Sequence, residues 1–525
     1  MNRLGAACLL LLLETLAASA SVNVKISSPA NNAVVGASAH YVAAATSSHR
    51  ITGMQIYVDG KKAYATTGSQ LNTTIALSVG SHQITVKAWD STGAVGRASQ
   101  VINSSNALVP PPPPPNPNPI KPTTTLVAET GNNTSAANSF LGWSNGDIAP
   151  TNISKLSIKT LVPWFGGKLL AHYMPWWGAS GHKSNGQSSH DPAQAERIVE
   201  DMISRGFDGV MVSESNSSSW DQQGALALFA AIENHSGFYF IAGENKGALD
   251  SASNKTAKLI ADMQFDDQHY FNSPNYLRWN GRPVVVFFDS AANISGVDWA
   301  AAKAGSAQFS NPLWIFRNSS GFGYTASDGA FAWIGSASGS DPYGLSYLKG
   351  FYSEAMSHTS DLAVGSAWRG FNDSMASWGK GKVISGHCGQ TWLASMALAT
   401  TTFESSSHQI PFLKVNTWND YEEGTEVETG VDNCGSVSAS LSGTALNFAP
   451  KFTADGSEKT VDHYTVFIST DGQNLAHLTD LPVGSRVLNV GSFNLASGTY
   501  YLYVKMIGKP MITNHMSGRV TYVVK

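Results

Sequence analysis

Residues 284–288 read Val-Val-Val-Phe-Phe and lead directly into Asp289. A short apolar run of β-branched and aromatic residues is typical of a strand that is buried on both faces. Similar runs recur on both sides of it, from about residue 160 to residue 434, and stretches with a helical pattern separate them. Together the runs predict eight strands, at residues 169–174, 209–213, 238–242, 284–288, 313–316, 331–334, 362–366 and 412–417.

The stretches between these runs carry helix signals. Residues 192–205, for example, follow Asp191, a suitable N-cap, and begin with Pro192, which is favoured at the first helical position. Strands that alternate with helices over this length predict a (β/α)8 TIM-type barrel, with a doubly wound parallel sheet as the alternative. No GxGxxG follows the first strand, and no GxSxG follows a predicted strand as a nucleophile elbow would. We therefore expect neither a dinucleotide site nor a nucleophile elbow, and no cofactor or metal.

The segments on either side of the barrel have a different pattern. Residues 21–105 alternate apolar and polar side chains between turn signals, which predicts a β-sandwich, and they resemble bacterial immunoglobulin-like modules. Residues 106–125 form a proline-rich linker. Residues 435–525 return to β character and resemble fibronectin type III or immunoglobulin-like modules. The barrel therefore occupies residues 126–434, with a lead-in over 126–160 that we expect to pack on it.

The N-terminus predicts export. Residues 1–20 combine Arg3, a short apolar run and an Ala-Ser-Ala ending, which is typical of a signal peptide cleaved near Ala20. The run is too short for a membrane span, and none is expected elsewhere. We therefore expect a secreted protein, extracellular or periplasmic. Cleavage leaves Cys388 and Cys434 as the remaining cysteines, and in an oxidising compartment we expect them to form a disulfide.

Composition excludes some partners. The chain has 525 residues and a formal net charge of −4, from 33 basic and 37 acidic residues. This balance argues against binding to nucleic acid or an anionic membrane surface. Charged residues make up only 13% of the chain, whereas it contains 14 tryptophans. Indole rings stack on the C–H faces of sugars, so the composition favours a carbohydrate partner. We expect a monomer.

Acidic and aromatic residues follow the predicted strands. In a (β/α)8 barrel the chemistry lies where strands end and loops begin, at the carboxyl-terminal face. Glycoside hydrolysis needs one carboxylic acid to protonate the leaving oxygen and a carboxylate to activate water or attack carbon. The candidates for contact with substrate at these strand ends are His172, Tyr173, Trp176, Trp177, Glu214, Glu244, Asp289 and Trp368.

The last predicted strand leads into the most acidic loop. Trp418, Asn419, Asp420 and Tyr421 come first, and Glu422, Glu423, Glu426 and Glu428 follow. A loop with only a structural role would gain nothing from so much repulsion between like charges. The loop is therefore the first candidate for the catalytic carboxylates. A weaker hypothesis is that its oxygens bind Ca²⁺, although the run lacks EF-hand spacing.

Several of these segments together resemble glycoside hydrolase family 71 and its family 99-like relatives. The matching motifs are Leu170–Met174, Arg205–Gly209, Tyr276–Val285 and Thr417–Tyr421. The resemblance implies a (β/α)8 barrel with α-1,3-glucanase or endo-α-mannosidase activity. In family 71 the last strand ends in W-N-D-Y-G-E, whose Asp and Glu are the catalytic pair. This pattern carries over to Asp420 and Glu423, with Trp418, Asn419 and Tyr421 as matching neighbours that contact substrate.

The chain departs from the family pattern at Glu422, where family 71 has glycine. Glu422 is therefore a rival catalytic residue, or a charge that shifts the pKa values of its neighbours. The leading hypothesis is a secreted, endo-acting glycoside hydrolase on an α-linked polysaccharide, with an α-1,3-glucan favoured. The alternative is a non-catalytic carbohydrate-binding or surface protein built on a hydrolase-like barrel.

Overall fold

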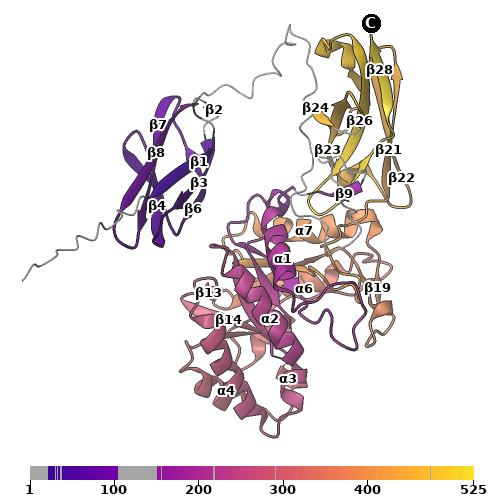
Figure 1. Cartoon of the computed structure of the whole chain (residues 1–525). Coiled ribbons are helices and arrows are strands. Elements are labelled where there is room, and N and C mark those ends of the chain that lie inside the picture. The colour runs from indigo at the N-terminus through magenta and orange to yellow at the C-terminus, as the bar shows by residue number, and fades with distance from the viewer. Residues whose placement is uncertain are drawn as a thin grey trace, which may run out of the picture. The chain divides into compact units, whose positions relative to one another are not determined.

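The computed structural model describes residues 22–104 and 151–525, apart from residues 30, 32, 36–37, 155, 214, 217–218, 290 and 473–474. The chain divides into two compact units, residues 1–115 and 116–525, and each is described by itself (Figure 1). The predicted signal peptide and the proline-rich linker lie outside the described residues. No helix in the described part of the chain is long and apolar enough to span a membrane.

The first unit consists of two β-sheets. One sheet has the order β1-β3-β6 and the other the order β2-β8-β7-β4-β5. Tyr41, Ile56 and Ile84, which are fully buried, come from both sheets and share one core. The predicted sandwich is confirmed, with strands at β1 Asn23–Ser28, β2 Val34–Val35, β3 Ser38–Thr46, β4 Ile51–Val58, β5 Lys61–Thr67, β6 Gln70–Ala76, β7 Gly80–Asp90 and β8 Val95–Ser104.

The second unit contains the barrel. Eight parallel strands among the described residues pair in the order β12-β11-β10-β20-β17-β16-β15-β14, and the pairing of β12 with β14 closes the ring. Closure confirms the (β/α)8 barrel and excludes the doubly wound sheet. The strands are β10 Lys168–Tyr173, β11 Gly209–Val212, β12 Tyr239–Glu244, β14 Arg282–Phe287, β15 Leu313–Arg317, β16 Gly329–Phe331, β17 Leu362–Trp368 and β20 Phe412–Asn416.

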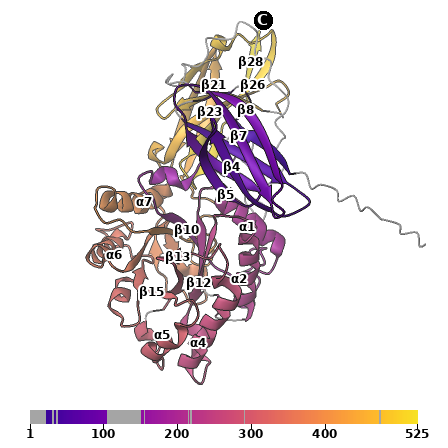
Figure 2. The same ribbon diagram turned by 90° about the vertical axis from the view of Figure 1, so that its left-hand side faces the viewer.

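Helices surround the strands, as the ring of α1, α2, α4, α5, α6 and α7 in Figure 2 shows. The prediction for α1 is confirmed in detail, because the Asp191 side chain accepts a hydrogen bond from the Ala193 backbone N–H at 2.9 Å. The α-helices are α1 Pro192–Ser204, α2 Ser219–Ile232, α3 Lys246–Asp250, α4 Lys255–Asp266, α5 Trp299–Ser306, α6 Leu345–Ser357 and α7 Gln390–Phe403.

Side chains alternate along each barrel strand. On β14, Val284 and Val286 belong to the core inside the barrel, whereas Val285 and Phe287 belong to the core under the helices. Both sides are buried, which explains why this strand is apolar throughout. Short elements complete the barrel region: β13 Arg278–Trp279, β18 Phe371–Asn372, β19 Val383–Ile384, a π-turn at Asp267–Phe271, and 3-10 turns at Ile158–Leu161, Ala291–Asn293, Ser319–Gly323, Asp373–Met375 and His387–Gly389.

The C-terminal strands form two further sheets, one of order β21-β22-β25 and one of order β24-β23-β26-β27-β9 with β28 beside β26. Strand β9 comes from the lead-in segment, and in Figure 1 it lies, in magenta, against the C-terminal sheet. The elements are β9 Thr151–Ile153, β21 Gly435–Ser442, β22 Ala445–Phe452, β23 Val461–Ser469, β24 Ala476–Pro482, β25 Val487–Asn489, β26 Gly498–Gly508, β27 Thr513–Met516, β28 Val520–Val524, and 3-10 turns at Glu458–Thr460 and Val490–Phe493.

The lead-in is therefore attached in two ways. Residues 151–153 extend the C-terminal sheet, while Ile158 packs into the barrel core and its backbone N–H donates to Arg205 O. Of the lead-in that was predicted to pack on the barrel, residues 126–150 lie outside the described residues, and in the described part Ile158 packs there. The expected disulfide between Cys388 and Cys434 is present, with a Cα–Cα distance of 5.3 Å.

Candidate active site

A cavity of about 360 Å³ opens at the carboxyl-terminal ends of the barrel strands. Every residue of its lining follows a strand, either at once or on the loop beyond it. This is the face on which (β/α)8 barrels carry their chemistry. The lining consists of Met174, Trp176, His182, Ser213, Asn245, Phe288, Asp289, Trp333, Trp378, Asp420 and Glu423.

Two carboxyl groups from the loop after β20 reach this cavity. Asp420 Oδ1 accepts the backbone N–H groups of Glu422 and Glu423, at 3.1 and 2.9 Å. Glu423 Oε1 accepts the indole N–H of Trp378 at 3.1 Å. The backbone N–H of Asp420 in turn donates to Thr417 Oγ1 at 2.9 Å. Both acids are therefore held in defined positions at the cavity.

The environment favours the protonated form of both acids. Burial raises the pKa of Asp420 well above its ordinary value, and the neighbouring Glu423 and Glu422 carboxylates raise it further. Burial also raises the pKa of Glu423, although the Trp378 N–H, Lys382 and Arg317 oppose that shift. Two neighbouring carboxyl groups of this kind titrate as a pair, so one proton shared between them is the favoured state over an intermediate pH range.

Aromatic rings form one wall of the cavity. The Trp176 indole stacks on the His182 ring, with centroids 4.8 Å apart and planes 9° apart. Trp378 meets both rings edge-on, at 5.9 Å from Trp176 and 5.7 Å from His182. Flat faces beside a polar floor are suited to pyranose rings, which have apolar C–H faces and polar edges.

Asn419 fixes the acidic loop to the start of the first βα loop. Its Oδ1 accepts the Met174 N–H at 2.8 Å, and its Nδ2 donates to Met174 O at 3.0 Å. The indole N–H of Trp177 donates to Asn419 O at 3.0 Å. The Asn419 side chain is fully buried and supports the cavity without being part of its lining.

Glu422 also lies behind the lining. Its two oxygens accept from His182 Nδ1, at 2.7 Å, and from the Lys183 backbone N–H, at 2.8 Å. It therefore holds the loop that brings His182 against Trp176. Of the three acids predicted for catalysis, the structure places Asp420 and Glu423 at the cavity and gives Glu422 a supporting position.

Five predicted aromatic contacts lie outside the cavity lining, four of them buried and Tyr421 half-buried. Tyr173 is 2% exposed and Trp177 is fully buried. Trp418 is fully buried between Phe207 and the Arg205 guanidinium. The Trp368 indole N–H donates to Tyr343 O, and the Tyr421 hydroxyl donates to Glu428. Among the described residues, none of these five aromatics belongs to the cavity lining.

His172 lies beneath the cavity floor. Its ring is fully buried, 4.9 Å from Trp333 and 6.2 Å from Phe288, and both of these aromatics belong to the lining. Neither ring nitrogen has a hydrogen-bond partner in the described part of the chain. Burial and the nearby Lys414 and Arg317 hold the pKa of His172 well below its usual range, so the ring is neutral.

The remaining predicted acids have different positions. Asp289 lines the cavity, and its Oδ2 accepts the Lys246 backbone N–H at 2.9 Å, so it also caps the turn after β12. Glu244 is buried behind the lining, where its Oε1 accepts from Asn216 Nδ2 at 2.8 Å. Burial and the Asp262 and Asp266 carboxylates raise the pKa of Glu244. Glu214 lies outside the described residues.

Seven lining residues were not predicted. Met174, Ser213, Asn245, Phe288 and Trp333 lie one or two residues past the ends of the observed strands. Four of them fell inside predicted strands whose ends were placed too late, and Asn245 lies three residues past the predicted end of the third strand. His182 and Trp378 lie on long loops that have no periodic pattern. Among the described residues the acids of the Asp420–Glu428 loop form no group of three that could hold a metal ion.

Comparisons with known proteins give one family match. Residues 23–86 match the family described as bacterial Ig domain, in agreement with the first sandwich. A search of curated proteins finds no match to the chain.

Similar solved structures include the GH99 endo-α-mannosidase from Bacteroides thetaiotaomicron, at 16% identity and a TM-score of 0.40, covering 50% of this chain and 88% of that one. They also include a glycoside hydrolase-like protein, at 13% identity and 0.38, covering 50% of this chain and 87% of that one. A third is a β-glucuronidase from Bacteroides uniformis, at 7% identity and 0.35, covering 96% of this chain and 60% of that one. At these identities and TM-scores the likenesses assign no activity to the chain.

Proposed function

We propose that the chain is a glycoside hydrolase in which Asp420 and Glu423 are the catalytic carboxyl pair. The observation that carries the proposal is their meeting at one cavity, on the face where barrels perform chemistry, with both pKa values raised by burial. The protonated member donates to the glycosidic oxygen as that bond breaks. The ionised member activates water or attacks the anomeric carbon.

Hydrolysis by such a carboxyl pair can invert or retain the configuration of the anomeric carbon. Inversion needs carboxyl groups about 6.5–9.5 Å apart, with room for water, whereas retention through a covalent intermediate needs about 5–5.5 Å. Family 71, which residues 417–421 resemble, acts with inversion, and this favours the first course. The anomeric form of the first product, followed by NMR, decides between the two. We propose an α-linked polysaccharide as substrate, with α-1,3-glucan favoured over α-mannan. Trp176 and Trp378 supply stacking planes for its sugars.

We also propose that the protein is exported. The leader at residues 1–20 motivates this, and the disulfide is stable in the oxidising compartment to which it would lead.

The test begins with a screen of the full chain on α-1,3-, α-1,4- and α-1,6-glucans and α-mannans, with detection of new reducing ends. Asp420→Asn and Glu423→Gln should each lower kcat on the active substrate by about 10²- to 10⁴-fold, the usual contribution of general acid–base groups. Both substitutions keep an acceptor oxygen, so Tm should stay close to that of the wild type.

Asp289→Asn is the matched control, since Asp289 is an acid of the same cavity whose bond to the Lys246 N–H an amide oxygen can keep. Its kcat should stay within about tenfold of wild type, below the range expected for a catalytic carboxyl group. Near-normal turnover by both pair variants would refute the assignment. Binding of a glucan without any turnover would instead support the carbohydrate-binding alternative, which the aromatic wall also permits.

A further inference from the structure

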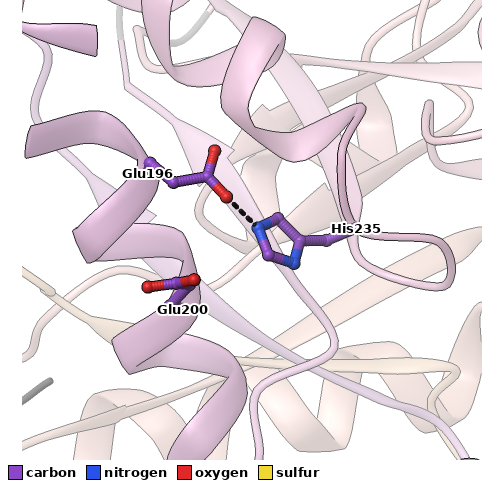
Figure 3. A group of neighbouring side chains, drawn as sticks. All are labelled: Glu196, Glu200 and His235. Carbon is purple, nitrogen blue, oxygen red and sulfur yellow. Dashed lines mark hydrogen bonds and ion pairs between the residues drawn. The ribbon is translucent and has the colours of Figure 1, made fainter. Parts of the chain in front are cut away.

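Three side chains able to bind a metal meet on the outer wall of the barrel. Glu196 and Glu200 lie one turn apart on α1, and His235 lies in the turn between α2 and β12. One ligand atom from each lies within 4.8 Å of those of the other two. Figure 3 shows both glutamates on one helix beside the imidazole, with a dashed line joining Glu196 to His235. None of the three belongs to the cavity lining.

The turn that carries His235 is firmly held. Asn275, a buried residue, points its Nδ2 at three carbonyls of this turn, those of Ile232, His235 and Phe238, at 3.2, 2.8 and 2.8 Å. The backbone N–H of His235 donates to Ile232 O at 2.9 Å. The imidazole therefore projects from a fixed backbone.

Helix α1 is equally fixed, because Ile198, Val199 and Met202 on its inner face are buried in the barrel core. Ligands on two well-packed elements lose little freedom when an ion binds them, which favours binding.

The charges of this group are poorly balanced without a cation. Glu196 Oε1 lies 2.5 Å from His235 Nε2, and Glu196 Oε2 accepts from Asn234 Nδ2 at 3.0 Å. Glu200 has no hydrogen bond or ion pair within the described ranges, and like charges at positions i and i+4 of a helix repel. An ion between the carboxylates would replace that repulsion with attraction to both.

We propose that Glu196, Glu200 and His235 bind a Zn²⁺ ion, with water completing its coordination. One imidazole nitrogen and two carboxylate oxygens are ligands that zinc accepts, at about 2.0–2.2 Å each, whereas Ca²⁺ and Mg²⁺ prefer oxygen alone. Tetrahedral ligands at that distance are about 3.3 Å apart, so Glu196 Oε1 and His235 Nε2 need to separate by less than an ångström. Side chains that are 34% and 23% exposed can do so.

The ion would link two successive βα units of the barrel. Helix α1 follows β10, and the His235 turn leads into β12, so the site ties together segments that are separated in sequence by α2 and β11. Its expected effect is on stability, because a ligand that binds the folded state alone raises Tm as its concentration exceeds Kd.

The experiment uses the full chain, freed of metal with EDTA and then dialysed against Zn²⁺, with metal analysis and thermal melts. We expect one zinc per chain and a rise in Tm of a few degrees, which EDTA reverses. Glu200→Gln should abolish both effects without lowering the metal-free Tm, because Glu200 has no partner to lose within the described ranges and the substitution relieves its repulsion of Glu196. His235→Gln should also abolish zinc binding.

His358→Gln is the matched control. His358 forms a comparable pair with Glu354, at 3.9 Å, but no third ligand joins this pair among the described residues. This variant should bind zinc as the wild type does. The proposal fails if the wild type binds no zinc at micromolar concentration, or if Glu200→Gln binds it equally well. Neither outcome bears on the proposed hydrolase, whose cavity shares no residue with this site.

Discussion

The five acids between residues 420 and 428 differ in what their carboxyl groups touch. Glu422 accepts from His182 and Lys183, Glu426 pairs with Arg369 at 3.0 Å, and Glu428 accepts from Gln187 and Tyr421. Only the other two, Asp420 and Glu423, line the cavity within the described part of the chain. The acidity of this loop thus serves structure at three positions, and a catalytic role stays a prediction for Asp420 and Glu423.

Trp378 gives a test of the role of Glu423. Its indole N–H donates to Glu423 Oε1 and favours the ionised carboxylate, so Trp378→Phe should raise the pKa of Glu423 further. One limb of the pH profile of kcat/KM should then move to higher pH. A shift of the acidic limb identifies Glu423 as the group that must be ionised, and a shift of the basic limb identifies it as the proton donor.

Trp176→Phe is the control for that experiment. Trp176 lines the same cavity, but its indole nitrogen has no hydrogen-bond partner among the described residues. This variant should change KM and leave both limbs in place. A Trp378→Phe profile that superimposes on the wild type would contradict the expected coupling.

Glu428 should make folding depend on pH. Burial raises its pKa from 4.5 to about 7, so the folded protein keeps a proton that the unfolded chain releases above pH 4.5. Its contribution to stability is therefore complete below pH 4.5 and is lost as the pH rises through about 7. The full shift corresponds to roughly 3 kcal/mol in the free energy of unfolding.

Glu428→Gln cannot titrate at this position. Urea unfolding at a series of pH values should show the wild type losing stability relative to the variant between pH 4.5 and 7. A constant difference between the two proteins over that range would show that Glu428 does not titrate there.

At the scale of elements, the barrel strands were predictable because each is buried on both faces and therefore apolar throughout. All eight predicted runs overlap strands of the barrel within the described residues. Strand β16 is the least accurate: the prediction was 331–334, whereas the strand is Gly329–Phe331 and Trp333 already belongs to the cavity. An apolar side chain that lines a ligand cavity cannot be distinguished by pattern from one that fills a core.

Strand β9 shows what a local pattern cannot supply. Its three residues pair with Thr513–His515, more than 350 positions away, and Asn152 meets Asn514 in a buried hydrogen bond of 2.9 Å. The same limit applies to His182 and Trp378, which reach the cavity from separate loops. Trp176 and Asp289 lie three and two residues past the ends of β10 and β14, so their position at the cavity was predictable.

The disulfide should stabilise the junction between α7 and β21. Cys388 lies just before α7 and Cys434 just before β21, and the closed loop spans 46 positions. Chain entropy for a loop of that length corresponds to about 4 kcal/mol. The Cys388→Ser/Cys434→Ser variant should therefore unfold at lower urea concentration, while kcat stays within about twofold. An unchanged midpoint would show that the rest of this junction holds without the bond.

At the scale of the whole molecule, the barrel and the C-terminal sheets depend on each other. Met511 and Ile512, from the turn before β27, belong to the barrel core, and the Trp392 indole N–H donates to Pro510 O at 3.0 Å. Val431 exchanges backbone hydrogen bonds with Met511 and Thr513, at 2.8 and 3.0 Å. The core of the first unit, in contrast, draws all its residues from positions 22–102.

Two truncations should therefore behave in opposite ways. A chain that ends at residue 434 loses the partners of Trp392 and leaves β9 unpaired, so apolar surface and a strand edge become exposed and we expect aggregation. A chain that lacks residues 1–115 loses the whole core of the first unit and keeps the core of the second unit intact. Its melting transition should therefore match that of the second unit in the full protein. Soluble yield and calorimetry of the two truncated chains measure this directly. A stable barrel that ends at residue 434 would show that Met511 and Ile512 cover its core without being needed to hold it together, and the C-terminal sheets would then count as a separate folding unit.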